Sequence, residues 1–350
     1  MKPPQPKITI LMPVFNAEKH LLDAMDSILN QTFADFEFLI INDGSADRSC
    51  EIISSYADAR IRLVHNDTNL GVEKTLNKGF TLAKGDYIAR MDSDDISLPA
   101  RLEKQVAFMQ AHKHIAVCGT WIETFGATHR THKYPGSHKD ICCRLLFETA
   151  LAHPSVMLRR NVLLQSSLLY DETHQYRRAE DYDLWVRISK IFDLANIGEV
   201  LLKYRQHESN VGQLHKTETE TTADRIRQRQ LEDFIPNISD DELALHSMIS
   251  NRRFQVSREF LAAAERWLQR IREANPAQGG YDEAALQNLL AHYWSRIGYQ
   301  ASRLGLHAWR RFRQSDLYSQ SALGIKKEMV FLLKCLLKKE FLYIGGTATR

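Results

Sequence analysis

The feature that most constrains the fold is an alternation of short apolar runs with amphipathic segments over the first 120 residues. The apolar runs have the length of buried strands, and they are Ile8–Val14, Phe36–Ile41, Arg60–Val64, Asp86–Met91 and Ile115–Gly119. The segments between them have apolar residues at helical spacing, and they are Ala17–Asn30, Arg48–Tyr56, Val72–Ala83 and Pro99–His112. This alternation predicts a mostly parallel, doubly wound α/β sheet.

Polar residues collect where three of these strands are expected to end. Pro13–Asn16 follows the first strand, Asn42–Ser45 the second and Asp92–Asp95 the fourth. The carboxyl ends of parallel strands meet at one edge of a sheet, where ligands of such folds bind. Loops are polar in most proteins. Three polar clusters that each follow the carboxyl end of a predicted strand nevertheless predict one ligand crevice. We also expect Asn16 to cap the first helix and Pro99 to begin the fourth.

The remainder of the chain has a less regular pattern. Residues 121–214 are expected to complete an α/β domain over residues 1–214, and residues 215–350 are expected to form a mostly helical extension. The expected extended segments and helices in these two stretches are Ser155–Leu158, Glu180–Ile191, Val200–Tyr204, Arg258–Ala274 and Glu283–Phe312.

Charge is unevenly distributed along the 350 residues. The net charge is +3, with 44% hydrophobic and 25% charged residues, a composition typical of a folded globular protein and not of a disordered or fibrous one. Residues 243–350 carry 17 Lys and Arg against 8 Asp and Glu, which leaves 29 against 35 for residues 1–242. The basic C-terminal part favours an anionic partner, either a membrane surface or a nucleic acid.

The targeting and cysteine patterns indicate a cytoplasmic protein. No stretch approaches the roughly 18 consecutive apolar residues of a membrane-spanning helix, and no secretory cleavage site follows the short apolar run that begins at Ile8. The five cysteines form no C-x-x-C pair, so neither a disulfide framework nor a structural zinc site is expected.

An acidic pair, Asp92 and Asp94, follows the fourth predicted strand. Carboxylate oxygens in this arrangement suit Mg²⁺ or Mn²⁺, which takes further ligands from water and from a substrate diphosphate. The pattern alone is weak, because Asp181 and Asp183 have the same spacing. Its interpretation depends on the motifs around it.

Five ordered motifs resemble glycosyltransferase family 2, in its non-processive bacterial type. They read ITILMPVFNAE from Ile8, INDGSAD from Ile41, NLG from Asn69, AKGDYIARMDSDD from Ala83 and RAEDYDLW from Arg178. The resemblance covers residues 7–210. It implies a GT-A fold, which is a Rossmann-like mixed sheet, and an inverting transfer of a sugar from a nucleotide diphosphate, taken here as UDP, to a glycan or lipid-linked acceptor in surface polysaccharide synthesis.

The resemblance also implies roles for residues 1–120 as the nucleotide-sugar-binding half and for 121–214 as the acceptor side. In the family, the first aspartate of D-x-D faces the ribose and sugar, and the second holds the metal on the diphosphate. Asp92 and Asp94 have these positions, with Mn²⁺ or Mg²⁺ as the cofactor. Asp43 would accept from the ring N–H of uracil, although the family usually has a second acid where this chain has Asn42. The expected nucleotide-sugar ligands are Pro13, Val14, Asn16, Glu18, Asp43, Asn69 and Asp92.

A base carried by another segment must take the proton of the attacking hydroxyl. Asp181 begins a predicted helix and matches the family's base, with Glu180 as the alternative; the helix N-terminus would favour the ionised form of Asp181. A purely structural reading is that both acids only complement the helix dipole. His207 and His153 occupy places where the family often has a histidine, and His207 is a candidate metal ligand.

Residues 325–343 combine basic and apolar side chains. Lys327, Lys334 and Lys338 fall on one helical stripe, with leucines and aromatics over the remainder. Such a helix can lie on an anionic bilayer, here the inner face of the cell membrane, or it can pack its apolar side on the domain. Nucleic acid is not expected as a partner, because the aromatics form no stacking series in a basic groove.

Two alternative functions are weighed against sugar transfer. A nucleotidyltransferase usually has a Gly-rich phosphate loop after the first strand, where this chain has Pro13–Asn16. A catalytically inactive family member would act as an assembly or binding subunit, but such proteins commonly lose an acidic site residue, and all four expected acids are present. These acids are Asp43, Asp92, Asp94 and Asp181.

Overall fold

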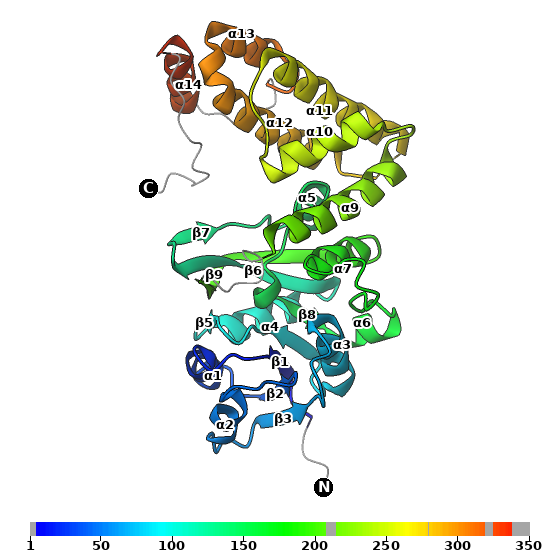
Figure 1. Ribbon diagram of the computed structural model, residues 1–350. Helices are drawn as coiled ribbons and strands as arrows, with labels where there is room; N and C mark the ends of the chain where they lie inside the picture. The colour runs from blue at the N-terminus through cyan, green and yellow to red at the C-terminus, as the bar shows by residue number, and fades with distance from the viewer. Residues whose placement is uncertain (1–4, 208–214, 279, 319–324, 338–350) are drawn as a thin grey trace. The chain divides into compact units, whose positions relative to one another are not determined.

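The computed structural model describes residues 5–207, 215–278, 280–318 and 325–337 (Figure 1). The chain divides into two compact units. Unit 1 comprises Met1–Ile141 and Thr149–Ala223, and unit 2 comprises Cys142–Glu148 and Asp224–Arg350. Within the described ranges, no helix is both long enough and apolar enough to cross a bilayer. The predicted division of residues 1–214 into a donor half and an acceptor half stays a prediction.

Unit 1 is built on one nine-stranded mixed sheet. In space the strands run β3-β2-β1-β4-β8-β6-β9-β5, and β7 pairs with β6. The first four strands pair in parallel, as predicted, whereas β5, β7 and β8 are antiparallel to their neighbours. The strands are β1 (Ile8–Val14), β2 (Phe36–Asn42), β3 (Ile61–His65), β4 (Tyr87–Arg90), β5 (Ile96–Ser97), β6 (Ile115–Gly126), β7 (Arg130–His132), β8 (Met157–Arg159) and β9 (Asp193–Gln206).

Helices cover both faces of the sheet around β1. Ile10 and Met12 of β1 belong to the same buried cluster as Met25 of the first helix. On the opposite face, Leu11 lies so close to Gly79 that a Cβ there would be 2.3 Å from its Cδ1. The helices that begin in this unit are α1 (Leu21–Leu29), α2 (Ser49–Ser54), α3 (Val72–Leu82), α4 (Arg101–Ala111), α5 (His138–Leu145), α6 (Arg160–Gln165), α7 (Glu180–Ser189) and α9 (Lys216–Phe234), with a 3₁₀ turn at His153–Ser155.

Two predicted helix starts are wrong. Asn16 does not cap α1, which begins only after His20; its φ of 49° is left-handed, and its side-chain oxygen accepts from the N–H of Ala46 in another loop. Pro99 is not the first residue of α4, which begins at Arg101. The Pro99 carbonyl instead accepts from Thr32 N–H at 2.9 Å, and this bond ties the start of α4 to the segment that follows α1.

Unit 2 is helical, as predicted. The single helix expected over Glu283–Phe312 is wrong, because a 3₁₀ turn and Gly305, with φ of 67°, break it into two. Gly305 adopts this left-handed conformation without the steric cost of a Cβ. After α9, which ends in this unit, the helices are α10 (Asp240–Asn251), α11 (Arg258–Gln278), α12 (Glu283–Gln300), α13 (Leu306–Gln314) and α14 (Ile325–Leu337).

A short segment, Cys142–Glu148, supplies part of the core of unit 2 although it lies between unit 1 segments in the sequence. Its Leu146 and Phe147 are buried in one cluster with Trp267 and Trp294. Buried polar groups bind its backbone carbonyls, and these bonds are His246 Nε2 to Leu146 O (2.9 Å), Arg227 Nε to Phe147 O (2.7 Å) and Gln230 Nε2 to Leu145 O (2.9 Å). The sequence pattern did not predict that this segment belongs to unit 2.

His246 is the most enclosed of these groups. Its Nε2 must carry the proton, because it faces the Leu146 carbonyl, so Nδ1 accepts from Trp267 Nε1–H at 3.2 Å. Burial lowers the pKa of His246 to about 3. The ring is therefore neutral and has a fixed tautomer, which makes it part of the packing of unit 2.

Candidate active site

The loops that follow β1 and β2 are joined by hydrogen bonds. Backbone N–H groups of each loop donate to side chains of the other, so the two loops form one surface. The bonds are Asn16 N to Ser45 Oγ (3.0 Å), Glu18 N to Asp47 Oδ2 (3.0 Å), Ala46 N to Asn16 Oδ1 (2.9 Å) and Arg48 N to Glu18 Oε2 (3.1 Å). The predicted ligands Asn16 and Glu18 thus also fix the shape of this surface.

Asp43 fixes the loop after β3 against the same surface. Its Oδ1 accepts from Asn66 Nδ2 at 2.7 Å and from Leu70 N–H at 2.9 Å, and its Oδ2 accepts from Gly71 N–H at 3.0 Å. A carboxylate oxygen has two lone pairs, so one acceptor position remains on Oδ2. At the end of β1, the Val14 carbonyl accepts from Asp43 N–H at 2.8 Å.

Gly44 allows this third loop to approach. Its φ is 74°, and a Cβ at this position would lie 2.9 Å from Asn69 N and 2.9 Å from the carbonyl carbon of Thr68. The structure therefore brings the predicted residues of three loops together at the carboxyl ends of β1, β2 and β3. Those residues are Pro13, Val14, Asn16, Glu18, Asp43 and Asn69.

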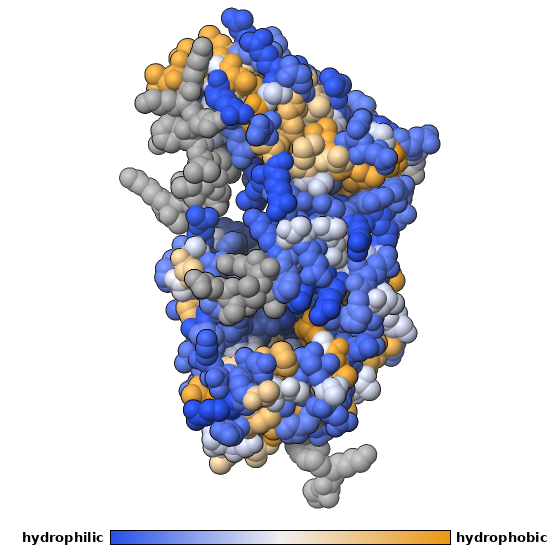
Figure 2. Space-filling view, in the orientation of Figure 1, coloured by the Kyte–Doolittle hydropathy of each residue, from blue (hydrophilic) through white to orange (hydrophobic). Residues whose placement is uncertain are grey.

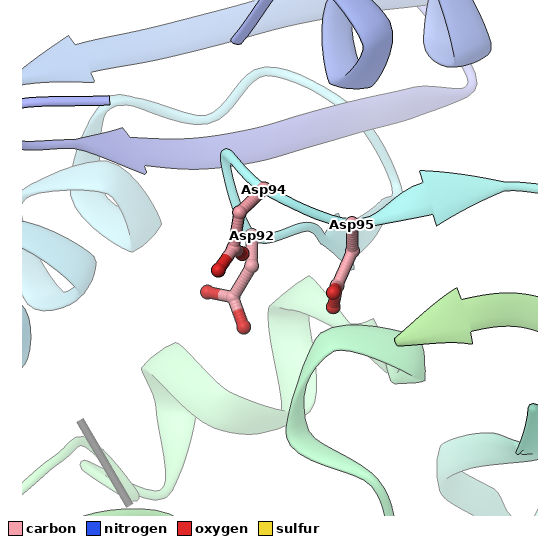
Figure 3. Close-up of side chains that lie close together, drawn as sticks. All are labelled: Asp92, Asp94 and Asp95. Carbon is pink, nitrogen blue, oxygen red and sulfur yellow. The ribbon is translucent and has the colours of Figure 1, made fainter. Parts of the chain in front are cut away.

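Three aspartates gather in the turn after β4, with their side chains on the same side of the turn (Figure 3). One carboxylate oxygen each from Asp92, Asp94 and Asp95 lies within 4.8 Å of the others. Arg90 binds Asp92 with both terminal guanidinium nitrogens. Its Nη1 lies 2.6 Å from Asp92 Oδ2, and its Nη2 lies 2.5 Å from Asp92 Oδ1. Burial nevertheless raises the pKa of Asp92, and the charge of Asp94 adds to this effect. The clustered carboxylates therefore oppose one another's ionisation, although Arg90 pairs with Asp92.

Asp95 was not among the predicted site residues. It is fully buried, and its Oδ1 accepts from the backbone N–H of Arg205 at 2.8 Å. Its Oδ2 has no hydrogen-bond partner among the described residues. Burial raises its pKa well above the usual range, and the charges of Asp92 and Asp94 raise it further. The only sequence signal was a third acid directly after the D-x-D pair.

The end of β9 brings a histidine to this cluster. His207 Nε2 lies 3.0 Å from Asp94 Oδ2, so the candidate ligand is next to the predicted metal carboxylate. Arg205 donates from Nε to the Asp94 carbonyl at 2.7 Å, which fixes the turn. Carboxylate oxygens with one imidazole nitrogen form a donor set that Mn²⁺ or Mg²⁺ accepts. The unpaired oxygen of Asp95 supports this fit, because a cation would satisfy it.

The two candidate bases lie at the N-terminus of α7. Burial raises the pKa of Glu180 to about 8, with a further increase from the charge of Asp181. Burial also raises the pKa of Asp181, but only to about 6. Hydrogen bonding to Tyr182 N–H and the charge of Arg90 oppose this increase. Arg90 and Asp92 both act electrostatically on Asp181, so the start of α7 and the end of β4 share one site.

Arg90 and Tyr170 are site residues that the sequence prediction missed. The Tyr170 hydroxyl is 2.7 Å from His153 Nε2, and burial holds the pKa of His153 well below its usual range. Neutral His153 is thus paired with Tyr170. Burial raises the pKa of Tyr170, whose hydroxyl also responds to the charges of Arg90 and Asp181. Arg90 could have been noticed as the one cation in the otherwise apolar run of residues 87–91.

A mixed α/β sheet with acidic residues at the carboxyl ends of its strands is the arrangement expected of a GT-A glycosyltransferase, and the sequence relatives show the family. Residues 9–178 match the model of Glycosyl transferase family 2. The chain is 32% identical to an uncharacterized glycosyltransferase of Haemophilus influenzae, over 69% of this chain and 79% of the relative. It is 30% identical to the UDP-Glc:alpha-D-GlcNAc-diphosphoundecaprenol beta-1,3-glucosyltransferase WfgD of Escherichia coli, over 58% and 79%. The chain belongs to glycosyltransferase family 2 and is a glycosyltransferase.

The fold is shared with a solved structure. S. aureus TarS 1-349 in complex with UDP-GlcNAc aligns with a TM-score of 0.55 and 16% identity, over 89% of each chain. The predicted GT-A fold with C-terminal helices is therefore confirmed. The family assignment also removes the nucleotidyltransferase alternative.

Proposed function

We propose that this glycosyltransferase moves a sugar from UDP to a lipid-linked or glycan acceptor, with inversion at the anomeric carbon, in surface polysaccharide synthesis on the cytoplasmic side of the membrane. The name of WfgD, which specifies a UDP-sugar donor and a diphosphoundecaprenol acceptor, supports the donor and the acceptor class. The UDP-GlcNAc bound to TarS, which has the same fold, agrees with a UDP donor.

The observation that carries this proposal is the meeting of two acidic groups from distant segments. The aspartate cluster follows β4, whereas Asp181 begins α7, and Arg90 contacts the first and acts electrostatically on the second. A displacement at the anomeric carbon needs one site for the departing diphosphate and a separate base for the incoming hydroxyl. The geometry offers both.

We infer that the aspartate cluster holds Mn²⁺ or Mg²⁺. We assign Asp94, Asp95 and His207 to the ion, because Asp94 and Asp95 belong to one carboxylate cluster and His207 Nε2 lies 3.0 Å from Asp94 Oδ2, whereas Arg90 binds both oxygens of Asp92. Asp92 is therefore assigned mainly to the ribose and sugar. When bound, the metal ion would neutralise charge on the diphosphate leaving group.

Asp181 is assigned as the base. With a pKa of about 6 it is mostly ionised at pH 7, whereas Glu180, with a pKa of about 8, is mostly protonated and cannot take up a further proton. Asp181 takes the proton of the acceptor hydroxyl while the hydroxyl oxygen forms a bond to the anomeric carbon. The bond from that carbon to the β-phosphate oxygen breaks at the same time, and UDP leaves.

The nucleotide is assigned to the three joined loops. The remaining acceptor position on Asp43 Oδ2 can take the ring N–H of uracil, as the family resemblance implies. Cytosine has no N–H at that ring position, so this contact favours uracil. The residues proposed to line the nucleotide sugar are Pro13, Val14, Asn16, Glu18, Asn69 and Asp92.

Calorimetric binding of UDP, GDP, CMP and TDP, with and without Mn²⁺, tests the donor and the metal together. We expect UDP to bind only with Mn²⁺ and Asp94→Asn to weaken this binding about a hundredfold, because it removes a charged ligand. Asp86→Asn is the matched control, since its carboxylate is exposed, pairs with Lys7 and precedes β4 at the opposite end from the cluster. Failure of all four nucleotides to bind would instead favour the non-catalytic subunit.

A further inference from the structure

The outward face of α14 is apolar. Its exposed hydrophobic side chains, which we call the α14 stripe, are Met329 (66% exposed), Val330 (43%), Leu333 (55%), Leu336 (57%) and Leu337 (56%). Their spacing puts them on one side of a helix. Hydrophobic side chains are seen gathered over α14 in Figure 2. Of the eleven large hydrophobic residues that are exposed in the described chain, five fall within these nine positions, so the stripe is a patch and not scatter.

The opposite face of α14 already packs on unit 2. Phe331 and Cys335 are each 1% exposed, and the Phe331 ring lies 5.1 Å from that of Phe312. Lys334 Nζ lies 3.9 Å from the centre of the Tyr299 ring. These contacts anchor the helix, so the α14 stripe is not needed to complete the core. A helix that is apolar on both sides has a second apolar surface to cover.

Charge indicates what covers it. Residues 303–350 contain 10 Lys and Arg against 3 Asp and Glu. In α13, which packs beside α14, Arg310 is exposed, and Arg313 is exposed with an ion pair to Glu328. Two copies of this basic region would repel each other across a shared interface, whereas an anionic lipid surface attracts basic residues beside an apolar face.

We propose that α14 is a membrane-docking helix, which lies along an anionic bilayer with the α14 stripe inserted among the lipid headgroups. The exposed Arg310 of α13 binds an anionic headgroup, whereas Arg313 stays paired with Glu328. Lys327 and Lys338 of the predicted lysine stripe lie outside the side chains that the structure describes, and Lys334 packs on Tyr299. The apolar stripe therefore carries the proposal, which does not depend on the proposed sugar transfer.

The test is co-sedimentation of the full chain with vesicles of phosphatidylglycerol and phosphatidylcholine, or of phosphatidylcholine alone. We expect binding to the anionic vesicles, and at least tenfold weaker binding to the neutral ones. Salt at about 1 M should weaken the anionic binding. The double variant Leu333→Asp/Leu336→Asp should bind at least tenfold more weakly, whereas the control Ile191→Asp, at a residue 62% exposed in unit 1, should bind like the wild type.

A second variant guards against misfolding of the first. A tryptophan at Met329→Trp should shift its fluorescence to shorter wavelength when anionic vesicles are added, and one at Ile191→Trp should not. The proposal is overturned if the wild type does not bind anionic vesicles, or if the double variant binds as well as the wild type. A dimer in sedimentation velocity that the double variant abolishes, without vesicle binding, would assign the stripe to a second copy of the chain.

Discussion

Two sets of buried polar groups, one in each unit, differ in their hydrogen bonding. In unit 2, His246, Arg227 and Gln230 are buried and donate to backbone carbonyls of the 142–148 segment. In unit 1, Asp95 and Glu180 each keep a buried carboxylate oxygen for which the described residues provide no partner. A buried group without a partner costs roughly 1–3 kcal/mol. Unit 2 also has such atoms, among them Ser250 Oγ and Trp294 Nε1, so the contrast lies between these five groups and not between the units as wholes.

Among these five groups, the difference separates those that we interpret as structural from those that we propose to be functional. A satisfied group such as His246 stabilises one arrangement of the chain, and it needs nothing from outside. An unsatisfied carboxylate is stabilised when a cation, a proton or a substrate hydroxyl arrives. Burial alone would rank the groups of both units together, and only the hydrogen-bond partners distinguish them.

The largest effect is expected at the base. Asp181→Asn should lower the rate of UDP release from the donor by about a thousandfold, because an amide cannot take the hydroxyl proton. UDP binding should stay near the wild-type value, because Asp181 is assigned to the acceptor hydroxyl. Steady-state kinetics and calorimetry on the same preparations check this pair of results. Loss of binding together with rate would assign Asp181 to the donor site.

The pH profile of the wild-type rate sharpens the choice between the two acids. A base must be ionised to work, so the rate should rise with pH and level off above the pKa of the base. For Asp181 the rise should centre near pH 6, and for Glu180 it would centre near pH 8. Glu180→Gln should leave the midpoint in place if Asp181 is the base.

The next largest effect is expected on the stability of unit 2. His246→Ala should lower the free energy of unfolding by about 3 kcal/mol, because it leaves a cavity and removes the partners of the Leu146 carbonyl and Trp267 Nε1–H. Urea denaturation measures this loss. UDP binding should be unchanged at temperatures where the variant is folded, and reduced binding there would contradict the division of roles between the units.

Acidification should affect the two units in opposite directions. The pKa of His246 in the folded state, about 3, lies below its value in the unfolded state. Its contribution to the free energy of unfolding is therefore present above pH 6.5 and is lost as the pH falls. Between pH 7 and pH 5 this loss is about 2 kcal/mol. The folded pKa of Glu180, about 8, lies above its unfolded value, so acidification stabilises its surroundings. Hydrogen exchange of α10 and α7 peptides, corrected for the intrinsic pH dependence, should show protection falling in α10 and not in α7.

The smallest effect is expected at Gly44. Gly44→Ala should weaken UDP binding about tenfold, because the added Cβ meets Asn69 N at 2.9 Å and the backbone has a left-handed φ. Calorimetry measures the change. Gly198→Ala is the control, since an added Cβ there would meet a Trp121 side-chain atom at 3.5 Å, an ordinary contact, and the φ of Gly198 carries no strain.

The sequence predicted those parts of the fold that depend on local pattern. Strands β1 to β4 lie between amphipathic helices, so apolar runs and helical spacing were enough to find them. Strands β5 and β7 have two and three residues and were missed. The pairing of Ile96 with Lys203 of β9 shows why, because so short a strand exists only through a distant partner.

The same limit applies to the site. Asp92, Asp94 and Asp181 were found because they stand in ordered motifs. The buried state of Asp95 depends on the N–H of Arg205, which lies 110 residues away in the chain, and no local pattern encodes it. The relative acidity of Glu180 and Asp181 depends on burial and on Arg90. These two adjacent carboxylic acids, which are chemically alike in the sequence, are therefore assigned different roles.

The contribution of Cys142–Glu148 to the core of unit 2 has a consequence for synthesis on the ribosome. Residues 1–141 and 149–223 emerge first and contain all nine strands of the sheet. At that stage Leu146 and Phe147 have none of the partners that α10, α11 and α12 later supply. The nascent protein thus exposes these two apolar side chains, which directly follow α5, until the helices are translated, and a gene truncated after residue 223 would produce a polypeptide that exposes them permanently.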